Sequence, residues 1–223
     1  MKPRVSNQTT SALTMMEVFV VIVVLLVLAA LLLYTRSYRP DMDLRRESQQ
    51  INCINNLKQI GLAYRVWEGN HGDKYPMQTS VTNGGTMELE NGRNAWINYS
   101  VMSNELSTPK ILFCPADTDK MAATNFTTDC NNSKISYFVG LDAEDTNPFM
   151  FLSGDDNFAI GGAPVKSELL QLSPNTPISW TASRHHFSGE IVFTDGSVQP
   201  SSNSDLTNCL QKTGVATNRL AIP

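Results

Sequence analysis

The first feature of the chain is a change from polar to apolar residues near its amino end. Residues 1–12 are mostly polar, and the next stretch, 13–34, is apolar apart from Thr14 and Glu17. As a helix with a rise of about 1.5 Å per residue, this stretch measures roughly 33 Å, enough to cross the hydrocarbon core of a bilayer. A secretory signal peptide has a shorter apolar part, which ends in a small-residue cleavage pattern. The pattern therefore predicts a transmembrane helix over 13–35.

A second, amphipathic pattern follows. Pro40 should interrupt the helix, because proline lacks the amide hydrogen and clashes with the preceding turn, and Asp41 or Asp43 could cap a renewed helix. We expect the renewed helix to pack one face against a sheet and to end in the glycine-rich turn 69–73. That face is predicted from apolar residues spaced by three and four, namely Ile51, Ile54, Leu57, Ile60 or Gly61, Tyr64 and Trp67.

The carboxyl-terminal half has the pattern of short strands. Segments of this kind lie at 110–113, 135–141, 178–181, 190–194 and 197–199. Asp195-Gly196 stands between the last two and predicts a two-residue hairpin turn. We therefore expect an α+β fold, in which a long amino-terminal helix, half transmembrane and half amphipathic, packs on a small antiparallel β-sheet. The expected divisions are a polar amino-terminal segment over 1–12, a transmembrane helix over 13–35, an amphipathic helix and loop over 36–75, and one globular β-rich domain over 76–223.

Composition narrows the possible functions. The net charge is −4 at pH 7, and no basic stripe marks a nucleic-acid-binding surface. None of the four cysteines forms a CxxC pair, so a zinc ribbon is not predicted. In an exported domain at least one disulfide is plausible, with buried reduced cysteines as the alternative. The three possible pairings stay open among Cys53, Cys114, Cys130 and Cys209.

Glu17 is the residue that indicates processing of the chain. A carboxylate in a membrane helix costs about 2.5–3.5 kcal/mol at the helix centre and less near its end, so it needs a partner. Four residues before it lies Leu13, which follows the small residue Ala12. Cleavage between these two residues would create an α-amine on Leu13, one helical turn from the carboxylate.

These residues resemble the amino-terminal signature of the type IV prepilin family, in which a short basic leader ends in a small residue and a glutamate follows inside an apolar helix. The resemblance implies that a prepilin peptidase cuts between Ala12 and Leu13, that Leu13 is N-methylated, and that Glu17 pairs with the amine of a neighbouring subunit. Ala12 stands where the family usually has glycine, and Leu13 stands where it usually has phenylalanine.

Further stretches carry the same resemblance. The helix end and the loop after it, residues 53–76, resemble pilin-like proteins through the run 56–63 and through Gly72, Tyr75 and Pro76. The carboxyl half resembles a pseudopilin-like subfamily with an exported domain. The segments that carry this second resemblance are 113–117, 136–140, 152–155, and His185 followed after nine residues by Asp195-Gly196.

The resemblance implies a structural subunit of a periplasmic pseudopilus of a type II secretion-type system. Such a subunit crosses the bacterial inner membrane once and carries its carboxyl-terminal domain in the periplasm, or outside the cell in a filament. The implied partners are other pseudopilin or pilin subunits in a homo- or hetero-oligomeric filament, the prepilin peptidase, the inner-membrane assembly platform and the secretion ATPase. The alternatives are a type IV pilus subunit for adhesion, motility or DNA uptake, and a membrane-anchored extracytoplasmic binding module or hydrolase. The binding module or hydrolase would have a pocket around His185, His186 and Asp195.

Candidate chemistry in the globular half is sparse. The oxygen-rich loop Asp155, Asp156 and Asn157 is a candidate Ca²⁺ site, because calcium prefers several oxygen ligands, and a solvated turn is the alternative. Adjacent histidines, His185 and His186, would point to opposite faces of a strand, which disfavours one metal ion between them. The sequence has no nucleophile elbow and no phosphate-binding glycine loop, so we expect no enzyme activity.

Overall fold

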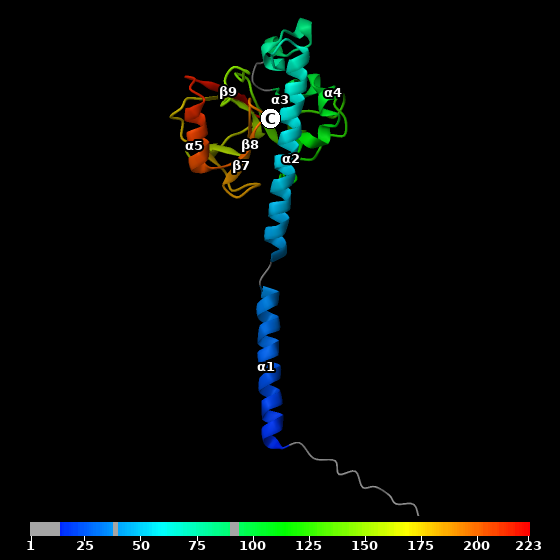
Figure 1. The fold of residues 1–223 in the computed structure, drawn as a ribbon, viewed down its shortest axis with the longest axis vertical. Coiled ribbons are helices and arrows are strands. Elements are labelled where there is room, and N and C mark those ends of the chain that lie inside the picture. Colours follow the sequence, from blue (N-terminus) through cyan, green and yellow to red (C-terminus); the bar gives the residue numbers. More distant parts are fainter. Residues whose placement is uncertain (1–13, 38–39, 90–93) are drawn as a thin grey trace, which may run out of the picture. The chain divides into compact units, whose positions relative to one another are not determined.

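The computed structural model describes residues 14–37, 40–89 and 94–223, so the predicted cleavage site at Ala12 and Leu13 lies outside the described residues. The chain forms two compact units, Met1–Leu44 and Arg45–Pro223 (Figure 1).

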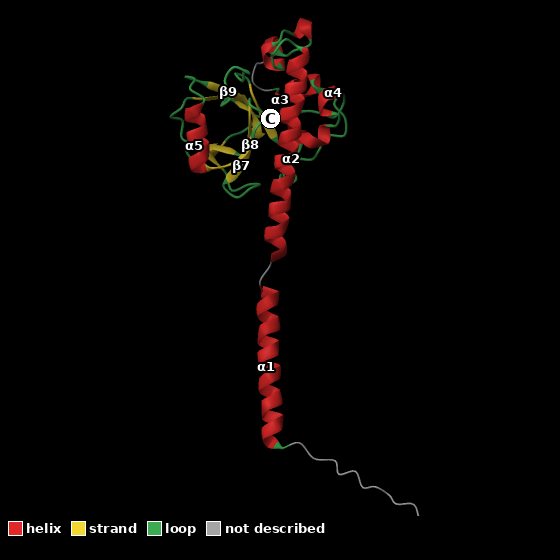
Figure 2. Cartoon of the chain, viewed as in Figure 1, coloured by secondary structure: helices red, strands yellow, loops and turns green. Residues whose placement is uncertain are grey.

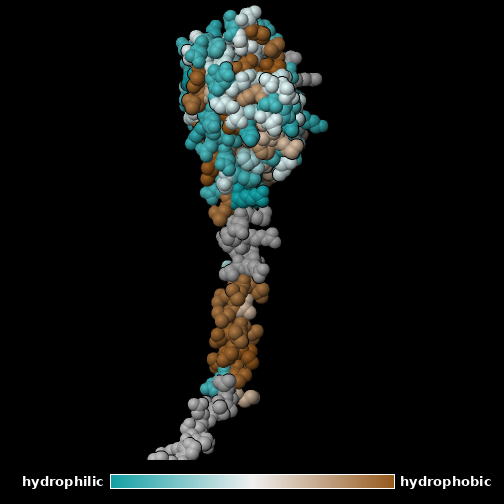
Figure 3. Space-filling view, turned by 90° about the vertical axis from the view of Figure 1, so that its right-hand side faces the viewer, coloured by the Kyte–Doolittle hydropathy of each residue, from teal (hydrophilic) through white to brown (hydrophobic). Residues whose placement is uncertain are grey.

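The first unit holds helix α1 (Met15–Ser37), whose side chains from Met15 to Tyr34 are all exposed. Figure 3 shows apolar side chains along the visible face of this helix. Within the described residues, it is the one helix long and apolar enough to span a membrane. Its amino end is capped by Glu17, whose Oε2 accepts hydrogen bonds from the backbone N–H of Thr14 at 2.8 Å and from its Oγ1 at 3.0 Å.

Helix α2 (Pro40–Asn70) is separate from α1, as Pro40 predicts. Its buried face includes four residues of the predicted stripe and also Cys53. The prediction is wrong for Ile51, which is 51% exposed, because two residues along a helix turn the side chain by about 200° from the buried position at Cys53. The helix ends at the predicted glycine-rich turn, where Gly72 has a φ of 69°. The four buried stripe residues are Leu57, Ile60, Tyr64 and Trp67.

The second unit contains two antiparallel sheets rather than the one small sheet that we expected (Figure 2). The larger sheet has the strand order β5-β9-β1-β2-β7-β8, and the smaller has the order β4-β3-β6. The strands of the larger sheet are β1 (Tyr137–Gly140), β2 (Phe151–Asp155), β5 (Leu169–Leu172), β7 (Ser188–Phe193), β8 (Val198–Ser202) and β9 (Asn218–Ala221). Those of the smaller sheet are β3 (Phe158–Ile160), β4 (Ala163–Pro164) and β6 (Ile178–Trp180).

The larger sheet is covered on both faces, and Figure 1 shows α2 and α5 (Asn203–Lys212) on opposite sides of it. Because side chains alternate along a strand, neighbouring residues of β7 enter different cores. Val192 packs with the α2 residues, and Ile191 packs with Leu206 and Leu210 of α5. The short helices α3 (Ala95–Val101) and α4 (Ser103–Leu106) were not predicted.

Four of the five predicted strands are confirmed as β1, β6, β7 and β8. The strand predicted at 110–113 is wrong: the segment is the 3₁₀ turn η4 (Pro109–Leu112), which begins with a proline after the capping residue Thr108. The hairpin loop between β7 and β8 has three residues rather than two, because Val192 pairs with Val198 and the Phe193 N–H donates to Ser197 O. Gly196 supplies the left-handed conformation that this loop needs, with a φ of 83°.

Candidate functional site

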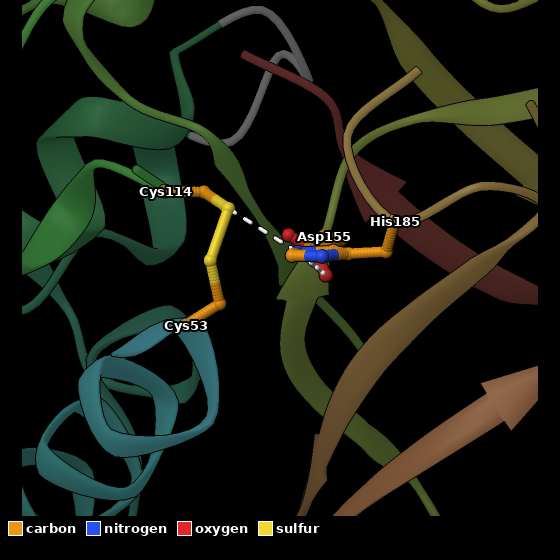
Figure 4. A group of neighbouring side chains, drawn as sticks. All are labelled: Cys53, Cys114, Asp155 and His185. Atoms are coloured by element: carbon orange, nitrogen blue, oxygen red, sulfur yellow. Dashed lines mark hydrogen bonds and ion pairs between the residues drawn. A yellow bond between two sulfur atoms is a disulfide. The ribbon is translucent and has the colours of Figure 1, made fainter. Parts of the chain in front are cut away.

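A disulfide between Cys53 and Cys114 settles the cysteine pairing that the sequence leaves open. It joins α2 to the loop after η4, with a Cα–Cα distance of 5.3 Å, and both residues are fully buried (Figure 4). Cys130 and Cys209 are free. The crosslink holds the first buried turn of α2 against the loop at 113–115.

An imidazole and two carboxylates lie directly beside this disulfide. His185 Nε2 lies 3.3 Å from Cys114 Sγ, 3.6 Å from Asp155 Oδ2 and 3.4 Å from Glu190 Oε2. Figure 4 shows His185 and Asp155 pointing toward the disulfide. The four side chains come from the loop after η4, from β2, from the turn before β7 and from β7. Segments far apart in sequence therefore meet at one buried point.

The two carboxylates have unequal surroundings. Asp155 Oδ2 accepts the backbone N–H of Glu190 at 2.9 Å, and Glu190 Oε1 accepts the Nε2–H of Gln50 at 2.7 Å. The other oxygens, Asp155 Oδ1 and Glu190 Oε2, accept no hydrogen bond from the residues that the structure describes. Burial chiefly, together with Asp155, raises the pKa of Glu190 to about 9, and burial lowers the pKa of His185. Near neutral pH this places a protonated carboxyl beside a neutral imidazole.

A buried ion cluster adjoins this group. The Nη2 of Arg184 pairs with Asp156 and, at 2.7 Å, with Asp117, and its Nη1 lies 3.7 Å from Asp155 Oδ1. Lys120 Nζ lies 2.8 Å from Asp156. Buried charges of this kind are tolerated only when they are paired and hydrogen-bonded. The cluster therefore fixes how the loops at 117–120 and 184–187 pack on β2.

The turn before β7 aims His185 inward. Arg184, His186 and Phe187 have positive φ angles of 64°, 57° and 63°, which non-glycine residues rarely adopt. His185 has its side chain 2% exposed, whereas His186 is exposed. The expectation that both histidines lie on one strand is wrong, because β7 begins only at Ser188. Strained backbone of this kind persists only where the surrounding structure enforces it, and it is common at functional sites.

The residues predicted for calcium divide between different partners. Asp155 faces His185, and Asp156 pairs with Arg184 and Lys120. Asn157 Nδ2 donates to Ser183 O at 3.1 Å. The calcium site stays an untested prediction.

The pocket of the binding-module alternative stays an untested prediction. His185 precedes β7 and Asp195 follows it, and a strand of six residues separates them by roughly 20 Å.

Sequence reasoning missed Gln50 as a site residue, although it lies three residues before Cys53 and so shares a helix face with it. It also missed the pairing of Asp117 with Arg184, because nothing in the sequence brings these two segments together. No protein-family model, curated protein or solved structure matches this chain.

Proposed function

We propose that this chain is a structural subunit of a periplasmic pseudopilus of a type II secretion-type system, anchored in the inner membrane by α1. The observation that carries the proposal is helix α1 itself. It is apolar on every face, its side chains from Met15 to Tyr34 are exposed, and its one acidic residue, Glu17, lies in the first turn.

A helix of this kind needs an apolar surrounding over its whole length. In water it would expose an apolar surface much larger than a monomeric soluble protein tolerates. A bilayer provides the apolar surrounding before assembly, and packed copies of the same helix provide it afterwards. Both surroundings are expected for a pilin-like subunit, which lies in the membrane first and in a filament afterwards.

Glu17 has a specific role in this proposal. In the described residues it caps its own helix through Thr14. Cleavage between Ala12 and Leu13 would place a new methylated amine on the residue before Thr14. In the filament, this amine on one subunit pairs with Glu17 of the next, so that neither charge remains unpaired at low dielectric.

The globular unit suits export. The disulfide between Cys53 and Cys114 is of a kind that persists in oxidising compartments such as the periplasm. The proposed partners are other pseudopilins, the prepilin peptidase, the assembly platform and the secretion ATPase. A type IV pilus subunit is the alternative within the same class.

The test is the intact mass of the protein purified from the membranes of its native host. The expected species begins at Leu13 and carries one extra methyl group. A chain that retains residues 1–12 would refute processing and favour a simple membrane anchor. A Glu17→Gln variant serves as the matched control for insertion: it should reach the membrane in equal amount but fail to enter filaments.

A further inference from the structure

We propose that His185, Asp155 and Glu190 bind one divalent transition-metal ion, of which Zn²⁺ is the type, while the disulfide is closed. The proposal does not depend on the function proposed above, because the site lies wholly within the globular unit.

The spacing of the three side chains fits a metal ion. Zinc bonds to imidazole nitrogen and carboxylate oxygen measure about 2.0–2.2 Å, and at tetrahedral angles they place neighbouring ligand atoms about 3.3–3.6 Å apart. His185 Nε2 lies 3.6 Å from Asp155 Oδ2 and 3.4 Å from Glu190 Oε2. These distances are too long for good hydrogen bonds. Both separations from His185 Nε2 lie within the range for ligands that share one ion.

The carboxylate oxygens that accept no hydrogen bond from the described residues also favour a cation site. Asp155 and Glu190 are 0% exposed, yet Asp155 Oδ1 and Glu190 Oε2 accept no hydrogen bond from the described part of the chain. A buried polar atom without a partner costs about 1–3 kcal/mol, and more when it is charged. A bound cation would remove this cost at Glu190 Oε2, whereas Asp155 Oδ1 lies 3.7 Å from Arg184 Nη1.

The net charge of the surrounding cluster is opposite in sign and equal in size to that of a divalent cation. Four carboxylates gather here, and the lysine and arginine beside them supply two positive charges. When the four carboxylates are ionised, they exceed the two cations by two negative charges. A divalent cation would displace the proton that Glu190 carries in the metal-free chain and would balance both charges. The four carboxylates belong to Asp117, Asp155, Asp156 and Glu190, and the two cations are Lys120 and Arg184.

The chemistry of the donors selects the ion. Calcium and magnesium prefer an all-oxygen environment, whereas imidazole with carboxylates suits zinc and its neighbours. Sulfur could also contribute in a reduced chain, because Cys53, Cys114, Asp155 and His185 bring ligand atoms within 4.8 Å of one another. In the structure both sulfurs are bonded to each other, so the closed form must bind through nitrogen and oxygen.

The experiment uses the full chain in detergent, with the disulfide intact and bound metal first removed by a chelator. After dialysis against Zn²⁺, elemental analysis should find one zinc per chain, with Ca²⁺ failing to compete at equal concentration. Co²⁺ as a spectroscopic probe should give visible d–d bands without a thiolate-to-cobalt charge-transfer band. This spectrum reports the ligands directly in the wild-type chain, without any substitution.

Adjacent histidines provide a matched pair of variants. His185→Ala should weaken zinc binding at least tenfold, and His186→Ala should leave it unchanged, because His186 is exposed in the same turn. Glu190→Gln keeps the size of the side chain, should keep the fold, and should also weaken binding at least tenfold. The proposal is overturned if the oxidised wild-type chain binds no zinc, or if both histidine variants bind equally. Binding that appears only after reduction, with a thiolate band, would overturn it too and assign the metal to the cysteines.

Discussion

Removal of the disulfide is the perturbation whose cost the structure defines best. Cys53 and Cys114 are 61 residues apart, and the chain-entropy relation for a loop of that length gives about 4 kcal/mol at 25 °C. This free energy arises because the crosslink restricts the unfolded chain. The double variant Cys53→Ala with Cys114→Ala should therefore be about 4 kcal/mol less stable than the oxidised wild type.

Urea unfolding followed by tryptophan fluorescence measures this difference. All three tryptophans, Trp67, Trp96 and Trp180, lie in the globular unit, so the signal does not report on α1. With a urea dependence of about 1–3 kcal/mol per molar, the midpoint should fall by about 1–4 M. Chelator in every sample keeps metal binding out of the comparison.

The free cysteines provide the control and the refutation. Cys209→Ala should leave the midpoint nearly unchanged, because this cysteine is only half-buried and bonds to no other. Alkylation of the denatured, unreduced chain should modify two of its four cysteines. Four modified cysteines, or a double variant that loses less than about 1 kcal/mol, would show that the reasoning from loop closure is wrong.

Three further predictions use the same unfolding assay. Arg184→Met should cost about 3–5 kcal/mol, because it leaves buried carboxylates unpaired, whereas Arg219→Met at a partly exposed pair should cost about 0–1 kcal/mol. In chelator, stability should fall as pH rises from 4.5 toward about 9, by at most about 1.4 kcal/mol per pH unit, because the folded chain keeps the Glu190 proton that the unfolded chain releases. Burial lowers the pKa of His185 and gives a contribution of opposite sign in both chains, so the test is the difference between them: the wild type should lose more stability over this range than Glu190→Gln, and equal slopes would contradict the burial argument. Gly189→Ala should cost about 1–3 kcal/mol, since its Cβ would lie 2.6 Å from the Trp180 ring; an unchanged midpoint would mean that the ring moves freely.

Helices α1 and α2 were predictable because their signals are local. Spacings of three and four identified the buried face of α2 from Leu57 to Trp67, and the unbroken apolar run identified α1. Both patterns depend only on helix geometry. The same geometry places the start of the buried stripe at Cys53 rather than at Ile51, because Ile51 lies about 200° around the helix from Cys53.

Strand β2 shows why part of the sheet was not predicted. Its sequence, Phe151–Asp155, contains serine, glycine and aspartate, and these residues read as a turn. It is nevertheless a central strand between β1 and β7. Gly154 suits this place because a Cβ there would lie 2.6 Å from the Glu190 carbonyl oxygen. Only the neighbouring strands reveal that requirement.

The candidate site depends on contacts that the sequence does not specify. Asp155 and His185 were both singled out, but for calcium in one case and for a histidine pair in the other. Their proximity follows from the pairing of β2 with β7, which brings Gly154 opposite Ile191. Positive φ angles in the turn before β7 then direct His185 toward the disulfide, and no motif signals this conformation.

The contacts around the disulfide define where the helix is fastened to its domain. Gln49 donates to Pro115 O at 2.8 Å, Gln50 donates to Glu190 at 2.7 Å, and Asn56 donates to Phe113 O at 3.0 Å. Together with the crosslink at Cys53, they lie at the first buried turns of α2. One covalent bond and three hydrogen bonds therefore hold the first buried turns of α2 to the loop at 113–115 and to β7, so the attachment of the helix does not depend on its apolar contacts alone.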